Sequence, residues 1–190
     1  MSTDPLYAVL LAGPPASGKS VLGAALARDI GAALLDQDVM TGPLTTVLSD
    51  VLGADGDLDH PLLRQATRQA TYDALLDTAV HNVEAGNGVV MVAPFTTERT
   101  ESAVWERVRQ RLRQAGAEPR LIWLACPGDE LVRRMRERAA ARDRSKLADV
   151  RAFLTSPALR PPVVEHTAVD ATAPMAEQLR QVRQALRTHR

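Results

Sequence analysis

Short apolar runs alternate along the chain with longer stretches in which apolar residues recur every three or four positions. The runs have the length of buried strands, and the longer stretches are typical of helices. The predicted strands span residues 6–12, 32–35, 89–93, 121–125 and 163–169. The predicted helices span residues 19–30, 43–52, 61–85, 101–115, 129–141 and 174–186, with a weaker helix ending at Leu154. Between them we expect an acidic loop at 53–59, a charged segment at 142–146 and a linker at 155–162.

This order of elements predicts the fold class. Parallel strands need long crossover connections, which helices usually supply, so the alternation favours a mainly parallel sheet covered by helices on both faces. We therefore expect an α/β protein with three layers and five strands. The length of 190 residues fits one domain.

Charge and composition exclude several classes of protein. The chain carries 23 basic and 23 acidic residues, so no net charge attracts it to nucleic acid or to an anionic membrane. No apolar run approaches the ~20 residues that span a bilayer, and the first residues do not resemble a signal peptide. A single cysteine, Cys126, excludes an internal disulfide. We expect a cytoplasmic protein that binds neither nucleic acid nor membranes.

One motif carries specific chemistry. Residues 13–20 match the phosphate-binding P-loop G-x-x-x-x-G-K-[ST], and they lie between a predicted strand and a predicted helix. Loop N–H groups and the following helix end would hold phosphate oxygens, Lys19 would reach the β- and γ-phosphates, and the Ser20 hydroxyl would bind Mg²⁺. A glycine-rich turn without a ligand is the alternative. The nucleotide-binding residues that the motif assigns are Gly13, Ala16, Ser17, Gly18, Lys19 and Ser20.

A nucleotide motif does not by itself name a reaction. A GTPase usually reads guanine with an Asn-Lys-x-Asp element, and neither Asn82 nor Asn87 is followed by lysine. Many motor ATPases carry a carboxylate at the end of a further strand, whereas residues 89–95 contain none. The carboxylate that supports the metal must therefore come from elsewhere in the chain.

Asp36-Gln37-Asp38 supplies two candidate carboxylates directly after the second predicted strand. In a parallel sheet the carboxyl ends of the strands open on the edge where ligands bind. We assign Asp36 to the support of Mg²⁺, and Asp38 to accepting the proton of an attacking hydroxyl. The alternative is that both aspartates cap the following helix.

Arginines recur every four residues at Arg134, Arg138 and Arg142, which would place them near one helical face. Guanidinium groups beside a P-loop suit the charge of a phosphoryl group in transfer, and Arg134 could instead stack on adenine. The alternative is a solvated face with ion pairs to Glu130 or Glu137.

The segment between Asp38 and the third strand has a similar pattern. Arg64, Arg68 and Tyr72 recur at the same spacing and could bind an anionic or polyhydroxyl acceptor. Exposed positions without a function are an equal alternative for these three. Glu98, after the third strand, and its neighbour Arg99 are further candidates for the wall of such a site.

With these residues in place, the sequence resembles the P-loop small-molecule kinases, a group that contains gluconate kinase, shikimate kinase and chloramphenicol phosphotransferase. It resembles most closely the bacterial AAA-family ATP-binding kinases of this type. The matching pieces cover nearly the whole chain and are the P-loop, Leu35–Asp38 with Thr41 and Pro43-Leu44, Ala93–Thr96, the pattern from Leu131 to Leu147, and Val169–Thr172.

The resemblance implies a lid that closes over ATP, an acid pair near the acceptor hydroxyl, and adenine held between the lid helix at Arg134 and the loop at Asp170. It implies one P-loop kinase domain with a core of residues 1–38, 86–132 and 160–190, acceptor-binding helices at about 40–85 and a lid at about 133–155. The acceptor-binding residues are then Asp38, Arg64, Arg68, Tyr72 and Phe95.

We therefore expect an ATP- and Mg²⁺-dependent kinase, monomeric or homodimeric, that phosphorylates a hydroxyl of a metabolite, sugar acid or antibiotic. Its expected catalytic residues are Lys19, Asp38, Arg138 and Arg142. One alternative is a regulatory module that hydrolyses ATP slowly and has no acceptor. Another is a polynucleotide 5′-kinase, against which the zero net charge and the 3% of aromatic residues count.

Overall fold

The computed structural model describes residues 5–54 and 60–187, so residues 55–59 of the expected acidic loop lie outside the described part. Within it, five strands form one sheet in the order β2-β3-β1-β4-β5, and neighbouring strands all pair in parallel. The strands are β1 (Leu6–Ala12), β2 (Ala33–Asp36), β3 (Val89–Val92), β4 (Ala117–Ala125) and β5 (Thr167–Asp170). This arrangement confirms the predicted α/β fold class.

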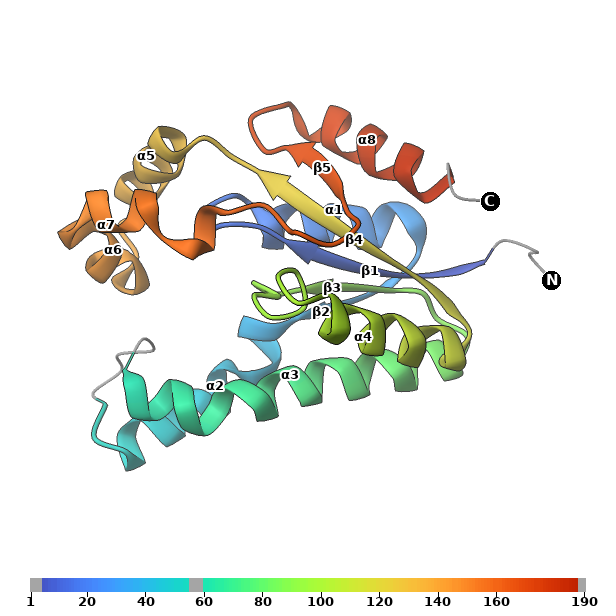
Figure 1. Ribbon diagram of the computed structural model, residues 1–190, viewed down its shortest axis with the longest axis horizontal. Coiled ribbons are helices and arrows are strands. Elements are labelled where there is room, and N and C mark those ends of the chain that lie inside the picture. The colour runs from blue at the N-terminus through green and yellow to red at the C-terminus, as the bar shows by residue number, and fades with distance from the viewer. Residues whose placement is uncertain (1–4, 55–59, 188–190) are drawn as a thin grey trace.

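Helices cover both faces of the sheet (Figure 1). Their bounds are α1 (Lys19–Ile30), α2 (Gln37–Val51), α3 (Pro61–Glu84), α4 (Ser102–Ala115), α5 (Gly128–Arg138), α6 (Arg144–Ala148), α7 (Val150–Thr155) and α8 (Met175–Arg187). Helices α1 and α8 pack on one face, and α3 and α4 pack on the other. Short 3-10 turns at Ala141–Asp143 and Pro157–Leu159 flank α6 and α7.

Strand β1 lies at the centre of the sheet and is enclosed on both sides. Its residues 8–12 are almost fully buried. Side chains alternate along a strand, so Leu10 faces α3 and α4 whereas Leu11 faces α1 and α8. A strand with two buried faces reads as an unbroken apolar run, which is why β1 was predictable from the sequence.

The strand order determines which segments meet at the edge of the sheet formed by the carboxyl ends of the strands, which we call the active edge. Because β3 lies between β1 and β2, the turn after β3 lies between the P-loop, which follows β1, and Asp36, which ends β2. Figure 1 shows α5, α6 and α7 grouped beyond this edge, on the opposite side from α2 and the N-terminal part of α3. The edge is therefore bordered by the P-loop, by two helices from the middle of the chain and by a group of short helices.

Several predicted boundaries were wrong. Helix α2 begins at Gln37, not at residue 43, because the Asp36 side chain caps it by accepting a hydrogen bond from the Asp38 N–H at 3.0 Å. Strand β4 begins at Ala117, where it pairs with Leu6 of β1, and not at residue 121. Strand β5 begins at Thr167 and not at residue 163. Helix α5 ends at Arg138, not at residue 141, since Ala139 takes a left-handed conformation with φ 50°.

Among the described residues, no helix is both long enough and apolar enough to cross a membrane.

Close contact between α1 and β3 generates a prediction about stability. A Cβ atom on Gly23 would lie 2.5 Å from Val92 Cγ2, and the valine side chain is stiff and buried. We expect Gly23→Ala to destabilise the protein by about 1–3 kcal/mol in urea unfolding. Val92→Ala removes the clashing methyl group, so the double variant should lose less than the sum of the two single variants. Additive losses would show that this contact does not limit the packing of α1.

Candidate active site

The loop at residues 13–18 joins β1 to α1 and has the shape of a cradle. Ala16 and Gly18 take left-handed conformations, with φ 63° and φ 99°. A Cβ atom on Gly13 would lie 2.8 Å from Ser17 Oγ and 3.0 Å from the Leu124 carbonyl oxygen, so only glycine fits there. The Ser17 hydroxyl is buried and has no hydrogen-bond partner in the described part of the chain. The loop therefore presents a curved backbone and a buried hydroxyl that still lacks a partner.

Helix α1 begins inside this cradle. Its N-cap residue is Gly18, which has no side chain to accept hydrogen bonds from the first-turn N–H groups. These groups carry partial positive charge, and an anion is the partner that satisfies them. The geometry thus fits a phosphate group, and it fits the nucleotide-binding role predicted for the loop.

Lys19 lies over the loop. Its ammonium group donates hydrogen bonds to the carbonyl oxygens of Gly13 at 2.9 Å and Pro14 at 2.8 Å. Burial lowers the pKa of Lys19 to about 8, and the charges of Asp38 and Asp36 partly oppose this shift. With this pKa the Lys19 side chain is charged at neutral pH. Phosphate oxygens carry more negative charge than carbonyl oxygens, so the ammonium group would exchange its carbonyl partners for phosphate oxygens.

Two side chains have oxygen atoms that could hold Mg²⁺. Ser20 is exposed in the first turn of α1. Asp36 is 7% exposed and uses one carboxylate oxygen, Oδ1, to cap α2. Because Mg²⁺ is commonly held by one or two protein oxygens together with phosphates and water, these two side chains fit such an ion.

Asp38 and Arg142 meet across the active edge. Asp38 Oδ2 lies 3.0 Å from Arg142 Nη1, and both side chains are largely exposed. Asp38 is in the first turn of α2, and Arg142 is in the 3-10 turn between α5 and α6. The pair joins segments that are 104 residues apart, and its worth for stability is small because solvent screens it.

Arg138 and Arg134 have different partners from Arg142. Arg138 forms a two-pronged ion pair with Asp143, whose carboxylate is 1% exposed. Arg134 donates to the backbone oxygens of Ser17 at 3.1 Å and Ala171 at 2.8 Å, and it pairs with Glu130. The expected common face of three arginines is therefore divided, with Arg138 shaping the turn and Arg134 fastening the P-loop to the segment after β5.

Asp170, which was expected beside adenine, ends β5 next to this fastening. Its Oδ1 accepts hydrogen bonds from the Thr172 N–H at 2.8 Å and from the Thr172 hydroxyl at 2.7 Å. These bonds lower the pKa of the Asp170 carboxyl and form a local turn. The carboxylate is exposed and shapes the segment that Arg134 holds.

The expected acceptor residues divide into two groups. Arg68, Tyr72 and Phe95 line one cavity of about 390 Å³ between α3, α4 and the sheet, whereas Asp38 and Arg64 do not line it. The rings of Tyr72 and Phe95 meet edge to face with centroids 6.0 Å apart. The Arg68 guanidinium lies over the Tyr72 ring at 5.5 Å and donates to Thr97 Oγ1.

Comparison with known proteins adds the family. The profile of a family described as an AAA domain matches residues 9–163, which is most of the chain. The chain belongs to this AAA-domain family. No curated protein sequence is significantly similar to it.

Solved structures share the fold of this AAA-domain protein over nearly its full length. A candidate kinase from Chloroflexus aurantiacus is 24% identical, with all of both chains covered and a TM-score of 0.70. The APS kinase of Mycobacterium tuberculosis, in complex with AMPPNP and APS, is 20% identical, with 97% and 99% covered and a TM-score of 0.64. A gluconokinase from Sinorhizobium meliloti 1021 is 19% identical, with 96% and 93% covered and a TM-score of 0.60. The expected likeness to P-loop kinases is confirmed at the level of the fold.

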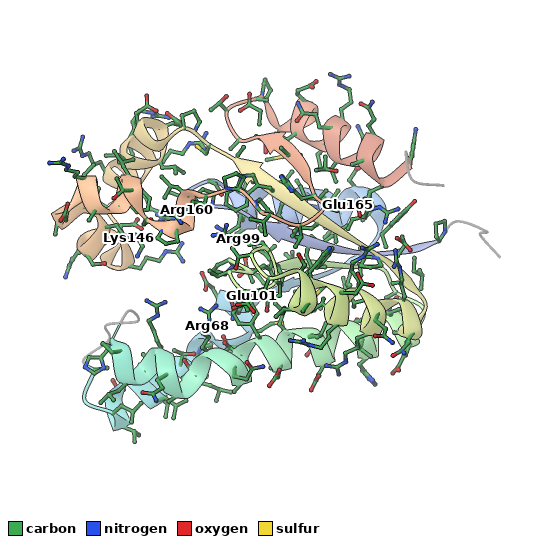
Figure 2. The ribbon with its side chains drawn as sticks, viewed as in Figure 1. Arg68, Arg99, Glu101, Lys146, Arg160 and Glu165 are labelled. Atoms are coloured by element: carbon green, nitrogen blue, oxygen red, sulfur yellow. The ribbon has the colours of Figure 1, made fainter. Side chains whose placement is uncertain are left out.

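Two structural roles in the AAA-domain protein were missed by sequence reasoning. Arg99, expected in the wall of the acceptor site, is 2% exposed, lies 4.8 Å from the centroid of the Trp123 ring and donates to the backbone oxygens of Pro157 and Arg160. Figure 2 shows Arg99 and Arg160 together beside the sheet. Asp143 was missed because it follows Arg138 by five residues, which is not a helical pairing distance.

The shifted lysine generates a pH prediction. The free protein holds a protonated Lys19 below about pH 8 and a neutral amine above it. Phosphate favours the ammonium form, so binding above that pH requires uptake of a proton. We expect the affinity for AMPPNP with Mg²⁺ to be flat below that value and to fall by up to about tenfold per pH unit above it.

Calorimetry from neutral pH to about pH 9 checks this. Lys19→Ala should bind weakly at every pH and lose the dependence, whereas Lys146→Ala, which changes the only other lysine, should keep it. An unaltered pH profile in Lys19→Ala would contradict the assignment of this group to the phosphates.

Proposed function

We propose that the protein is a phosphotransferase that moves the γ-phosphate of ATP to a hydroxyl of a small-molecule acceptor. The observation that carries this proposal is the position of Asp38. Its carboxylate stands in the first turn of α2, close enough to influence the charge of Lys19, and it reaches Arg142 on the other side of the active edge. A module that only binds nucleotide has no need of a second exposed carboxylate at this place.

The nucleotide half of the proposal rests on the cradle. The uncapped start of α1, the left-handed Ala16 and Gly18, and Lys19 together fit a triphosphate. Ser20 and Asp36 would hold Mg²⁺, which when bound neutralises charge on the transferred phosphoryl group. The structure of the mycobacterial APS kinase contains AMPPNP, an ATP analogue, on the same fold.

Transfer then needs little covalent chemistry from the protein. The acceptor oxygen attacks the γ-phosphorus, the bond to the β-phosphate oxygen breaks, and ADP leaves. Asp38 takes the proton of the attacking hydroxyl, while Lys19 and Arg142 balance the charge that develops on the phosphoryl oxygens. Arg138, which we had also expected at the phosphate, would act by holding the turn that carries Arg142, because its guanidinium is committed to Asp143.

We further propose that residues 133–155 move as a lid over a core formed by residues 1–38, 86–132 and 160–190. Met135 and Phe153 of this segment are buried in one small apolar cluster with Leu131, which precedes the segment, and Ala16 of the P-loop packs against this cluster. Because Ala16 belongs to the P-loop, a nucleotide bound to the P-loop would influence the lid through this contact.

The lid proposal predicts a change in protection against hydrogen exchange. Residues 134–146 should exchange faster without nucleotide and slow down when AMPPNP and Mg²⁺ bind, because lids of this kind move on the microsecond to millisecond scale. Helix α4, which packs on the opposite face of the sheet from α1, serves as the internal reference. Equal protection of 134–146 with and without nucleotide would contradict a moving lid.

One observation favours a second function, an ATP-binding regulatory module with slow hydrolysis and no acceptor. The two expected acid residues both have structural uses, since Asp36 caps α2 and Asp38 pairs with Arg142. In that case the ion pair between Asp38 and Arg142 would form or break as the lid closes or opens, without a role in phosphate transfer.

The variant Asp38→Asn separates the two functions. It keeps the size of the side chain but removes the proton acceptor, so transfer to an acceptor should slow by about 10²–10⁴-fold, while the affinity for ATP changes little. Asp36→Asn should instead alter the dependence of turnover on Mg²⁺. The measurements are ATP affinity by calorimetry and transfer rate with an acceptor found in a screen of hydroxylated compounds. Transfer near the wild-type rate in Asp38→Asn would contradict the assignment of Asp38 as the base that accepts the hydroxyl proton.

A further inference from the structure

The cavity between α3, α4 and the sheet has the size of a site for a small ligand. Its volume of about 390 Å³ falls within the range of ~300–1,000 Å³ that is usual for such sites. The floor is apolar, because Leu10, Leu75 and Met91 lie there with 1% exposure each. This part of the cavity therefore fits a compact apolar group of a ligand.

Two polar side chains interrupt the apolar lining. Tyr72 Oη and Glu98 Oε2 are both buried, and neither has a hydrogen-bond partner of normal geometry in the described residues. Burial raises the pKa of the Tyr72 hydroxyl, with a further rise from Glu98, and burial also raises the pKa of Glu98. Buried polar groups are nearly always paired in native proteins, so two unpaired oxygens in one cavity need an explanation.

The turn at residues 95–98 positions the Tyr72 and Glu98 side chains. The turn from 95 to 98 starts with Phe95 in a left-handed conformation, φ 45°, and the Arg99 N–H closes it on the Phe95 carbonyl oxygen at 2.9 Å. Its backbone N–H groups lie near both side chains: those of Phe95 and Thr96 partly lower the pKa of Tyr72, and those of Glu98 and Thr97 partly lower the pKa of the Glu98 carboxyl group. Figure 2 shows Arg68 on α3 at this side of the molecule, where it donates to Thr97.

The position of the turn connects the cavity to the proposed reaction. It follows β3, and β3 lies between the strand that leads to the P-loop and the strand that ends at Asp36. A ligand in the cavity would have its polar end at the active edge and its apolar end under α4.

The charges at the cavity mouth favour a neutral ligand. Arg111 pairs with Asp77 at 2.6 Å, and Arg68 is engaged with Thr97 and the Tyr72 ring. Asp73 accepts a hydrogen bond from Gln69. Arg68, Asp73 and Arg111, three of the five charged side chains that line the cavity, thus already have partners that a polyanionic ligand would have to displace.

We propose that this cavity holds the non-reacting part of the acceptor, and that the acceptor is a neutral alcohol with a compact apolar body and one hydroxyl bound between Tyr72 Oη and the Glu98 carboxyl group. The inference rests on the phosphotransferase function proposed above and names its class of acceptor. Because Asp38 does not line the cavity, the reacting hydroxyl of the same molecule would have to extend out of it towards the active edge.

Two simple alcohols, 2-phenylethanol and cyclohexylmethanol, test the cavity without nucleotide. Binding is followed by amide shifts in NMR spectra of the full-length protein, with the methyl ether of each alcohol as the analogue that cannot donate a hydrogen bond. We expect shifts at 95–98 and along α3, and about tenfold weaker binding of the ethers. Absence of binding by both alcohols, or shifts confined to other regions, would overturn the proposal.

The two tyrosines of the chain supply a matched pair of variants. Tyr72→Phe should weaken alcohol binding by about tenfold, whereas Tyr7→Phe should not change it, because the Tyr7 hydroxyl donates to the Leu186 carbonyl oxygen on the other face of the sheet. Melting temperature distinguishes binding from a structural role. Tyr72→Phe should leave it unchanged or raise it, while Tyr7→Phe should lower it by about 2–4 °C. A fall in melting temperature without a loss of alcohol binding in Tyr72→Phe would overturn the assignment.

A measurement of AMPPNP binding in the same samples separates this proposal from the proposed function. Failure of AMPPNP to bind while the alcohols occupy the cavity would contradict the phosphotransferase and leave the alcohol site standing. Binding of AMPPNP without any alcohol binding would contradict the acceptor class alone.

Discussion

The start of α1 has no side-chain cap, and the other features of the site depend on the uncapped N–H groups there. Gly18 offers no side-chain cap to the first-turn N–H groups, the left-handed residues of the loop curve the backbone around them, and Gly13 allows close approach. Lys19 adds a buried ammonium whose present partners are two carbonyl oxygens of the same loop. An anion with several oxygens would satisfy all of these groups at once, which is the physical reason for proposing that the site binds a triphosphate.

Four arginines connect this cradle to distant parts of the chain, each in a different way. Arg134 ties the P-loop to the segment after β5, Arg138 fixes the turn that follows α5, and Arg142 crosses the active edge to Asp38. Arg99 holds the chain where it returns from α7 towards β5. Planar guanidinium groups with several donors suit such bridging of backbone oxygens and carboxylates. Of these four, only the pair with Asp38 is exposed on both sides, so it is the connection that we propose opens in the lid motion.

The sequence was most informative where the determinants are local. A motif of eight adjacent residues located the cradle, and unbroken apolar runs located the central strands. Arginine spacing was less informative, because the common face of Arg134, Arg138 and Arg142 assumed a continuous helix, and α5 ends at Arg138. The cap at Asp36 extended α2 backwards past Pro43, which a helix start placed at proline does not anticipate. Arg64 and Arg68 are equivalent in the sequence, and only the packing of α3 against the turn after β3 places Arg68 at the cavity.

The central claim is that phosphate leaves ATP for an acceptor rather than for water. The most direct test is ³¹P NMR of the wild-type protein with ATP, Mg²⁺ and mixtures of neutral hydroxylated compounds. A phosphotransferase produces a phosphomonoester resonance that grows one for one with ADP and appears only when the right compound is present. Inorganic phosphate as the sole product in every mixture would contradict this claim and would identify a slow ATP-hydrolysing module instead.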